Sequence, residues 1–241
     1  RFSKDGLISE DLEANANLSS LELGYDIEFD GDDPYVLGDG TGTANRLQRI
    51  STDGGQTFSY TDMATFPATG TPTDFRGMAF DGTTAYLITQ SSANAEIWSV
   101  DISGALPAAS SLVTTLPDFD GCAGLDLDDD YFYTGCTGPD DQVIRIDRTT
   151  FVADVLTTNI DTSSSYNQPV VQDTDADGVA DVLWFQGFDD MVYLCTPAAS
   201  LPLFVRGFGT SEDADYGLSL DTVNNVLWRY DESPETLFRY E

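Results

Sequence analysis

The sequence contains no histidine, and its 10 lysine and arginine residues face 42 aspartates and glutamates, for a formal net charge of −32. Without histidine, the usual general base of hydrolytic triads and a common zinc ligand are both missing. A strongly negative field repels nucleic-acid phosphates and anionic lipids and attracts cations. We therefore expect no nucleic-acid partner. The acidity has two compatible interpretations, namely solubility in a salty medium and calcium binding.

Long apolar runs are missing as well. No run approaches the roughly 18 residues that a membrane-spanning helix needs, so we expect no membrane insertion. No segment has the pattern of a signal or transit peptide. The sequence starts at Arg1 and not at methionine, and we expect a mature or excised product. Hydrophobic residues make up 41% of the chain and aromatic residues 12%, which is enough to fill a core.

What the sequence does contain is a repeat. Five short segments of mostly alternating polarity recur at intervals of 45–51 residues, and each closes on an aspartate: Asp30, Asp81, Asp128, Asp173 and Asp221. Further apolar, β-branched or aromatic segments follow each of them, separated by turn residues. A period of this length, with four expected strands, is typical of propeller blades.

The sequence therefore predicts one all-β domain over residues 1–241, a five-bladed β-propeller of four-stranded antiparallel blades. The last blade lacks an outer strand, and we expect the N-terminal segment to supply it, because a closed ring leaves no open edge. The expected blades cover residues 24–66, 75–116, 121–160, 165–208, and 215–241 together with 2–12.

The strongest local motif is DTDADGVAD, at Asp173–Asp181. Its carboxylates at positions 1, 3, 5 and 9 and its glycine at position 6 match the first part of an EF-hand loop. Because the motif lies between two expected strands, it resembles the calcium hairpin of FG-GAP repeats in integrin-type propellers. The resemblance implies that Ca²⁺ stiffens this hairpin; the implied ligands are Asp173, Asp175, Asp177, Asp181 and the carbonyl of Val179. The alternative is a solvated, aspartate-rich turn.

A second motif, STDGGQTF at Ser51–Phe58, resembles the Asp-box of sialidase-type propellers. In that family the box is a structural turn, so the resemblance supports the fold and implies no activity.

Only three cysteines are present. Cys122 and Cys136 lie at equal distances from Asp129, the expected centre of a hairpin, and would face each other across it. We expect a cross-strand disulfide, which would place the protein outside the cytoplasm. Two reduced, buried thiols are the alternative. Cys195 has no partner in the sequence pattern, and we expect it to be buried.

Propellers generally bind ligands at the mouth of the central channel, and this analogy rests on the fold alone. Aromatic residues precede or begin the first strand of every expected blade, beside amide and charged groups. This composition suits a sugar or a peptide. The expected ligand-binding residues are Tyr25, Phe75, Arg76, Tyr166, Gln168 and Tyr216. Alternatively, the aromatic rings pack between blades.

These features favour a secreted or cell-surface, calcium-stabilised binding or adhesion module with a glycan or protein ligand. The sequence has no G-x-S-x-G motif and no phosphate-binding loop. A carboxylate-dependent glycoside hydrolase is an alternative, because such enzymes act through paired carboxylates. Its candidate residues are Asp26, Glu28, Asp74 and Asp126. A structural subunit of an extracellular assembly is a further alternative.

Overall fold

The structure is a computed structural model. It describes residues 21–30, 33–40, 45–52, 58–66, 74–90, 93–138, 141–158, 169–186, 191–197, 206–209, 215–221, 226–232 and 235–240. Within these ranges every regular element is a β-strand. The expected closing segment at residues 2–12 and the centre of the Asp-box motif, residues 53–57, lie outside the described residues.

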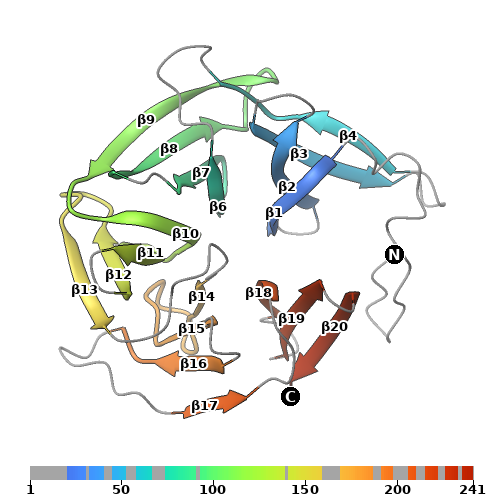
Figure 1. The fold of residues 1–241 in the computed structure, drawn as a ribbon. Helices are drawn as coiled ribbons and strands as arrows, with labels where there is room; N and C mark the ends of the chain where they lie inside the picture. Colours follow the sequence, from blue (N-terminus) through green and yellow to red (C-terminus); the bar gives the residue numbers. More distant parts are fainter. Residues whose placement is uncertain are drawn as a thin grey trace.

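The described strands form five sheets, which are arranged around a ring (Figure 1). Sheet 1 contains β1 (Leu21–Asp30), β2 (Asp33–Gly40), β3 (Asn45–Thr52) and β4 (Phe58–Asp62). Sheet 2 contains β6 (Phe75–Asp81), β7 (Thr84–Thr89), β8 (Ala95–Asp101), β9 (Ala108–Leu116) and the short β5 (Ala64–Thr65). Sheet 3 contains β10 (Asp120–Leu127), β11 (Tyr131–Gly138), β12 (Gln142–Asp147) and β13 (Ala153–Thr158).

Sheet 4 contains β14 (Pro169–Gln172), β15 (Val182–Gln186), β16 (Met191–Cys195) and β17 (Arg206–Gly209). Sheet 5 contains β18 (Asp215–Asp221), β19 (Val226–Glu232) and β20 (Glu235–Tyr240). In each sheet the first strand lies nearest the centre of the ring and later strands lie progressively outward (Figure 1). Consecutive strands within a sheet pair antiparallel, as the alternating segments and short turns predict.

β5 is the exception to this pattern. The expected first blade, residues 24–66, does not stay in one sheet, because β4 ends at Asp62 and the chain then crosses to sheet 2. There β5 pairs parallel with β9, with Ala64 opposite Ala108. Met63 joins the two sheets, since its amide donates to the Leu47 carbonyl (2.8 Å) and its carbonyl accepts from the Ala108 amide (3.0 Å).

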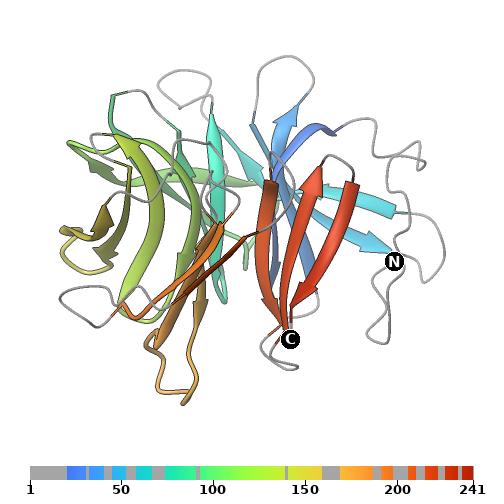
Figure 2. The same ribbon diagram turned by 60° about the horizontal axis from the view of Figure 1, so that its bottom comes forward.

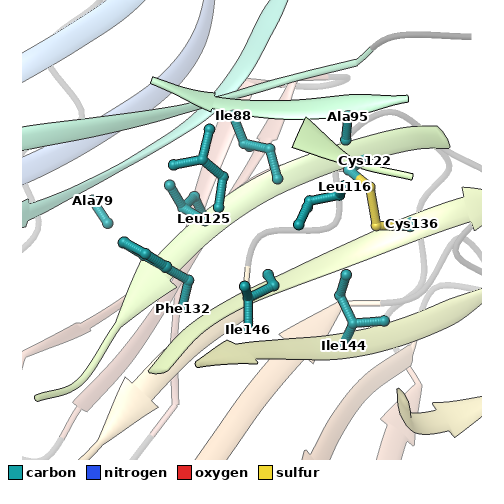
Figure 3. Close-up of a cluster of buried hydrophobic side chains, with 11 residues drawn as sticks. Ala79, Ile88, Ala95, Leu116, Cys122, Leu125, Phe132, Cys136, Ile144 and Ile146 are labelled. Carbon is teal, nitrogen blue, oxygen red and sulfur yellow. A yellow bond between two sulfur atoms is a disulfide. The ribbon is translucent and has the colours of Figure 1, made fainter. Parts of the chain in front are cut away.

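The apolar core is distributed over the interfaces between neighbouring sheets. Successive side chains of a strand point to opposite faces, and both faces are covered here. On β11, Phe132 therefore packs toward sheet 2, whereas Tyr133 packs toward sheet 4. The cluster between sheets 2 and 3 is drawn in Figure 3; its fully buried members include Ile88, Leu125 and Ile144. Sheets 1 and 2 enclose a corresponding cluster.

Candidate metal loop and the junction between sheets 3 and 4

The loop between β14 and β15, residues Asp173–Asp181, projects from one face of the ring (Figure 2). Hydrogen bonds to Asp173 fold it. One carboxylate oxygen of Asp173 accepts from the Ala176 amide (2.7 Å) and the other from the Gly178 amide (2.8 Å). The bond from Gly178 is the main cause that holds the pKa of Asp173 below its usual value. The first aspartate of the motif is therefore ionised and faces the interior of the turn.

Three of the expected metal ligands come together in this loop. One carboxylate oxygen from each of Asp173, Asp175 and Asp177 lies within 4.8 Å of the others. The charge of Asp177 is the main cause that raises the pKa of Asp175 above its usual value. The side chains of Asp175 and Asp177 are exposed. A cation placed among these oxygens would relieve their mutual repulsion, and carboxylate oxygens are the ligands that Ca²⁺ prefers.

The last two expected ligands, Asp181 and the carbonyl of Val179, are not part of this group of three carboxylates. One Asp181 oxygen accepts hydrogen bonds from the hydroxyl and the amide of Thr174, the latter at 2.9 Å. The hydroxyl of Thr174 is the main cause that lowers the pKa of Asp181. Asp181 thus holds the start of the loop. It is not one of the group of three, but its charge contributes to raising the pKa of Asp175. The amide of Val179 donates to Asp177 (2.9 Å), which holds the backbone of Val179 inside the loop.

Gly178 is required at its position for two reasons. Its φ of +90° lies in a region that side chains rarely adopt. In addition, a Cβ built on Gly178 would lie 2.1 Å from a carboxylate oxygen of Asp129, a residue of the turn between β10 and β11. The glycine of the motif therefore permits the turn and also admits a neighbouring carboxylate directly against the loop.

Asp128, which closes the third repeat segment, connects sheet 3 to this loop. It is 7% exposed. One carboxylate oxygen accepts from the amides of Asp130 (2.9 Å) and Tyr131 (2.6 Å) in its own turn. The other accepts from the Tyr133 hydroxyl (2.7 Å) and, across the junction, from the Ala180 amide (2.9 Å). A single carboxylate thus fixes the β10–β11 turn and holds the neighbouring loop.

Two inner-strand carboxylates join sheets in the same way. Asp126 accepts from the Val171 amide of β14 (2.6 Å) and from its own neighbour Leu127 (2.7 Å). Asp26 in β1 accepts from the Met78 amide of β6 (2.7 Å). Removal from solvent raises the pKa of the Asp126 carboxyl to about 7, although the residue keeps some exposed surface. Sequence reasoning named both residues only as catalytic candidates and missed this connecting role.

The predicted disulfide is confirmed. Cys122 and Cys136 face each other in the register of β10 and β11, and their sulfur atoms are bonded (Figure 3). Cys195 is a buried free thiol, as expected, and burial raises its pKa to about 12.

Of the expected channel-mouth residues, Phe75 lies inside the core. Its side chain has no exposed surface, and its ring packs against Phe66 and edge-on against Trp98. Packing between strands thus accounts for this aromatic residue, and we remove it from the ligand-binding set. Arg76 is half-buried, and its guanidinium pairs with Asp74 at 2.6 Å.

The remaining channel-mouth predictions are not tested. Tyr25 lies in β1 and Tyr216 in β18, but their side chains are outside the described part of the structure. Tyr166 and Gln168 also lie outside the described residues. Among the residues that are described, no helix is long and apolar enough to span a membrane.

No family model and no curated protein matches this sequence. Solved structures do match the fold. A chain of a nidogen/laminin complex aligns with a TM-score of 0.65 at 11% identity, over 89% of this chain and 74% of its own length. The structure of YjhT aligns with a TM-score of 0.56 at 12% identity, over 88% of this chain and 73% of its own.

A glutaminyl cyclase from Myxococcus xanthus aligns with a TM-score of 0.50 at 12% identity, over 84% of this chain and 83% of its own. Structural similarity at such low sequence identity shows a shared fold and gives no evidence of a shared activity. These neighbours are propellers with antiparallel sheets. The chain therefore has a β-propeller fold.

Proposed function

We propose that this chain is an extracellular or cell-surface binding module, a five-bladed propeller whose 173–181 loop holds Ca²⁺. The observation that carries the proposal is the group of three carboxylate oxygens within 4.8 Å of one another. The φ of +90° at Gly178 permits the turn in which the Gly178 amide donates to Asp173, the first member of this group. In this proposal the N-terminal segment, residues 2–12, completes the fifth blade.

The disulfide supports the extracellular assignment, because such bonds persist mainly in oxidising compartments. The proposed ligand is a glycan or a protein that binds at the channel mouth, near Arg76. Calcium acts as a stabiliser in this proposal, because the loop connects two neighbouring strands of sheet 4.

Calcium titration by calorimetry tests the metal site. We expect one Ca²⁺ per chain and a rise in the melting temperature with calcium. The double variant Asp175→Asn/Asp177→Asn should lose both effects. Asp154→Asn is the control, because Asp154 is an exposed carboxylate in β13, outside the loop. Calcium binding that survives in the double variant would refute the site. A glycan array and an extracellular-protein pull-down, each with calcium present, test the binding role.

One observation favours the hydrolase alternative. The raised pKa of Asp126 is the property expected of a general acid. Both of its oxygens, however, accept backbone hydrogen bonds, which accounts for the residue structurally. Hydrolysis of aryl glycosides by the wild-type protein, abolished by Asp126→Asn, would favour the enzyme over the binding module.

Exposed apolar side chains on the outer strands favour the third alternative, a structural subunit of an extracellular assembly. Among the described residues, the exposed large apolar side chains are Leu112 on β9 and Val152 and Val155 at β13, which are outer strands of two sheets. Sedimentation of the purified chain distinguishes the alternatives, because a stable oligomer favours assembly.

A further inference from the structure

We propose that Asp128 is a positioning residue for the calcium loop: by accepting the Ala180 amide it orients the Val179 carbonyl, so cation binding and the junction between sheets 3 and 4 stabilise each other. This inference rests on the proposed calcium site and extends it to sheet 3, outside the motif.

One peptide group links Asp128 to the proposed ligand oxygen of Val179. The carbonyl of Val179 and the amide of Ala180 belong to the same planar, trans unit, in which C=O and N–H point in opposite directions. The Ala180 N–H points to Asp128, 2.9 Å away. The Val179 oxygen therefore points away from Asp128. A hydrogen bond from N–H to a carboxylate also increases the negative charge on the carbonyl oxygen of that unit, which favours cation binding.

Asp128 is itself held rigidly. It is almost fully buried, and amides of its own turn and the Tyr133 hydroxyl occupy its other acceptor positions. Its carboxylate therefore cannot turn without breaking bonds on sheet 3. The orientation of the Val179 carbonyl is thus set by a neighbouring sheet as well as by the loop.

A second connection runs through Gly178. The Asp129 amide donates to the Gly178 carbonyl (2.9 Å), and the Gly178 amide donates to Asp173 (2.8 Å). A continuous path of bonds therefore leads from the β10–β11 turn to the first proposed ligand. Outer groups that orient metal ligands typically change metal affinity by 10–100-fold when mutated.

The first test measures calcium affinity in Asp128→Asn by calorimetry at fixed ionic strength. We expect affinity to fall at least about 10-fold, because the substituted amide replaces an acceptor oxygen with a donor. The matched control is Asp130→Asn, which removes the same charge from the same turn. Asp130 is exposed, and its hydrogen bond to Asp128 comes from the backbone amide, which the substitution keeps. Equal affinity losses in the two variants would overturn the inference, because they would reflect net charge alone.

The second test needs no variant. Amide exchange of the full-length wild-type protein is followed by NMR with chelator and then with calcium. Calcium should slow exchange at Ala180 and also at Asp129, which lies in the turn between β10 and β11 and is not a proposed ligand. Slower exchange confined to residues 173–181 would overturn the coupling while leaving the calcium site intact. A wild-type protein that binds no calcium would overturn both proposals.

Discussion

Gly77 in β6 and Gly124 in β10 meet backbone to backbone where the inner strands of sheets 2 and 3 pass each other. A Cβ built on Gly77 would lie 2.5 Å from the carbonyl carbon of Gly124 and 2.6 Å from the amide nitrogen of Leu125. Backbone atoms of two strands cannot give way as a flexible side chain can. The distance between these sheets therefore depends on the missing side chain.

Gly77→Ala should lower the free energy of unfolding by about 3 kcal/mol, because the added methyl group forces the two strands apart. Gly104→Ala is the control, since a Cβ at Gly104 meets nothing within 4 Å. We expect that variant to change stability by less than about 1 kcal/mol. Urea unfolding measures both, and equal values for the two variants would contradict the close approach.

Asp126 should make stability depend on pH in the neutral range. Its pKa is about 7 in the folded chain, against about 4 when unfolded. The folded protein thus binds the proton more tightly, so this contribution is complete below pH 4 and is lost as the pH rises through 7. From pH 8 to about 5.5 the free energy of unfolding should rise by about 2 kcal/mol in calcium-free buffer.

Asp126→Asn should flatten this dependence, and Asp130→Asn, which alters an exposed carboxylate, should not. Urea unfolding at several pH values provides the measurement. If Asp126→Asn kept the full dependence of stability on pH, a group other than Asp126 would take up the proton.

The disulfide should stabilise the chain by restricting its unfolded state. Cys122 and Cys136 are separated by 14 residues, and closing a loop of this size contributes about 3 kcal/mol. Cys122→Ala/Cys136→Ala should lose about that amount by urea unfolding. Reductant should lower the stability of the wild-type protein and leave that of the double variant unchanged. If reductant lowered the stability of both proteins equally, the disulfide would not be the cause.

Arg148 and Asp81 should show a coupling between sheets 2 and 3. Arg148 follows β12, pairs with Asp81 at the end of β6, and also donates to the Asp128 carbonyl (2.6 Å). Its guanidinium carbon lies 5.4 Å from the centre of the Phe132 ring. A double-mutant cycle of Arg148→Ala and Asp81→Asn should give a coupling of about 1 kcal/mol, since Asp81 is half-exposed. Strictly additive effects would show that the packing of Arg148, and not its charge, joins the sheets.

Local pattern was sufficient to predict the strands and the cysteine pairing. Alternation and turn residues define strands over a few positions, and the symmetric placement of Cys122 and Cys136 about Asp129 needs no distant information. The group formed by Asp173, Asp175 and Asp177 was likewise predictable, because one turn holds all three.

The contacts between sheets were not predictable from the sequence. In a chain with 42 acidic residues, Asp126 and Asp128 look like any solvated aspartate. Their roles depend on which amide of the next sheet lies opposite them, and only the packing of the ring decides that. The burial of Phe75 was not predictable either. An aromatic ring at the start of a strand can face the channel or the core, and the surrounding sequence looks the same in both cases.

The crossing of β5 changes where one repeat can be separated from the next. Met63 is tied to β3 on one side and to β9 on the other, and its side chain is 1% exposed. The exchangeable module for shuffling repeats is therefore not a single sheet. A chimera joined after β4 must therefore keep residues 63–65 together with β3 and β9. Otherwise β9 in sheet 2 loses its pairing with β5.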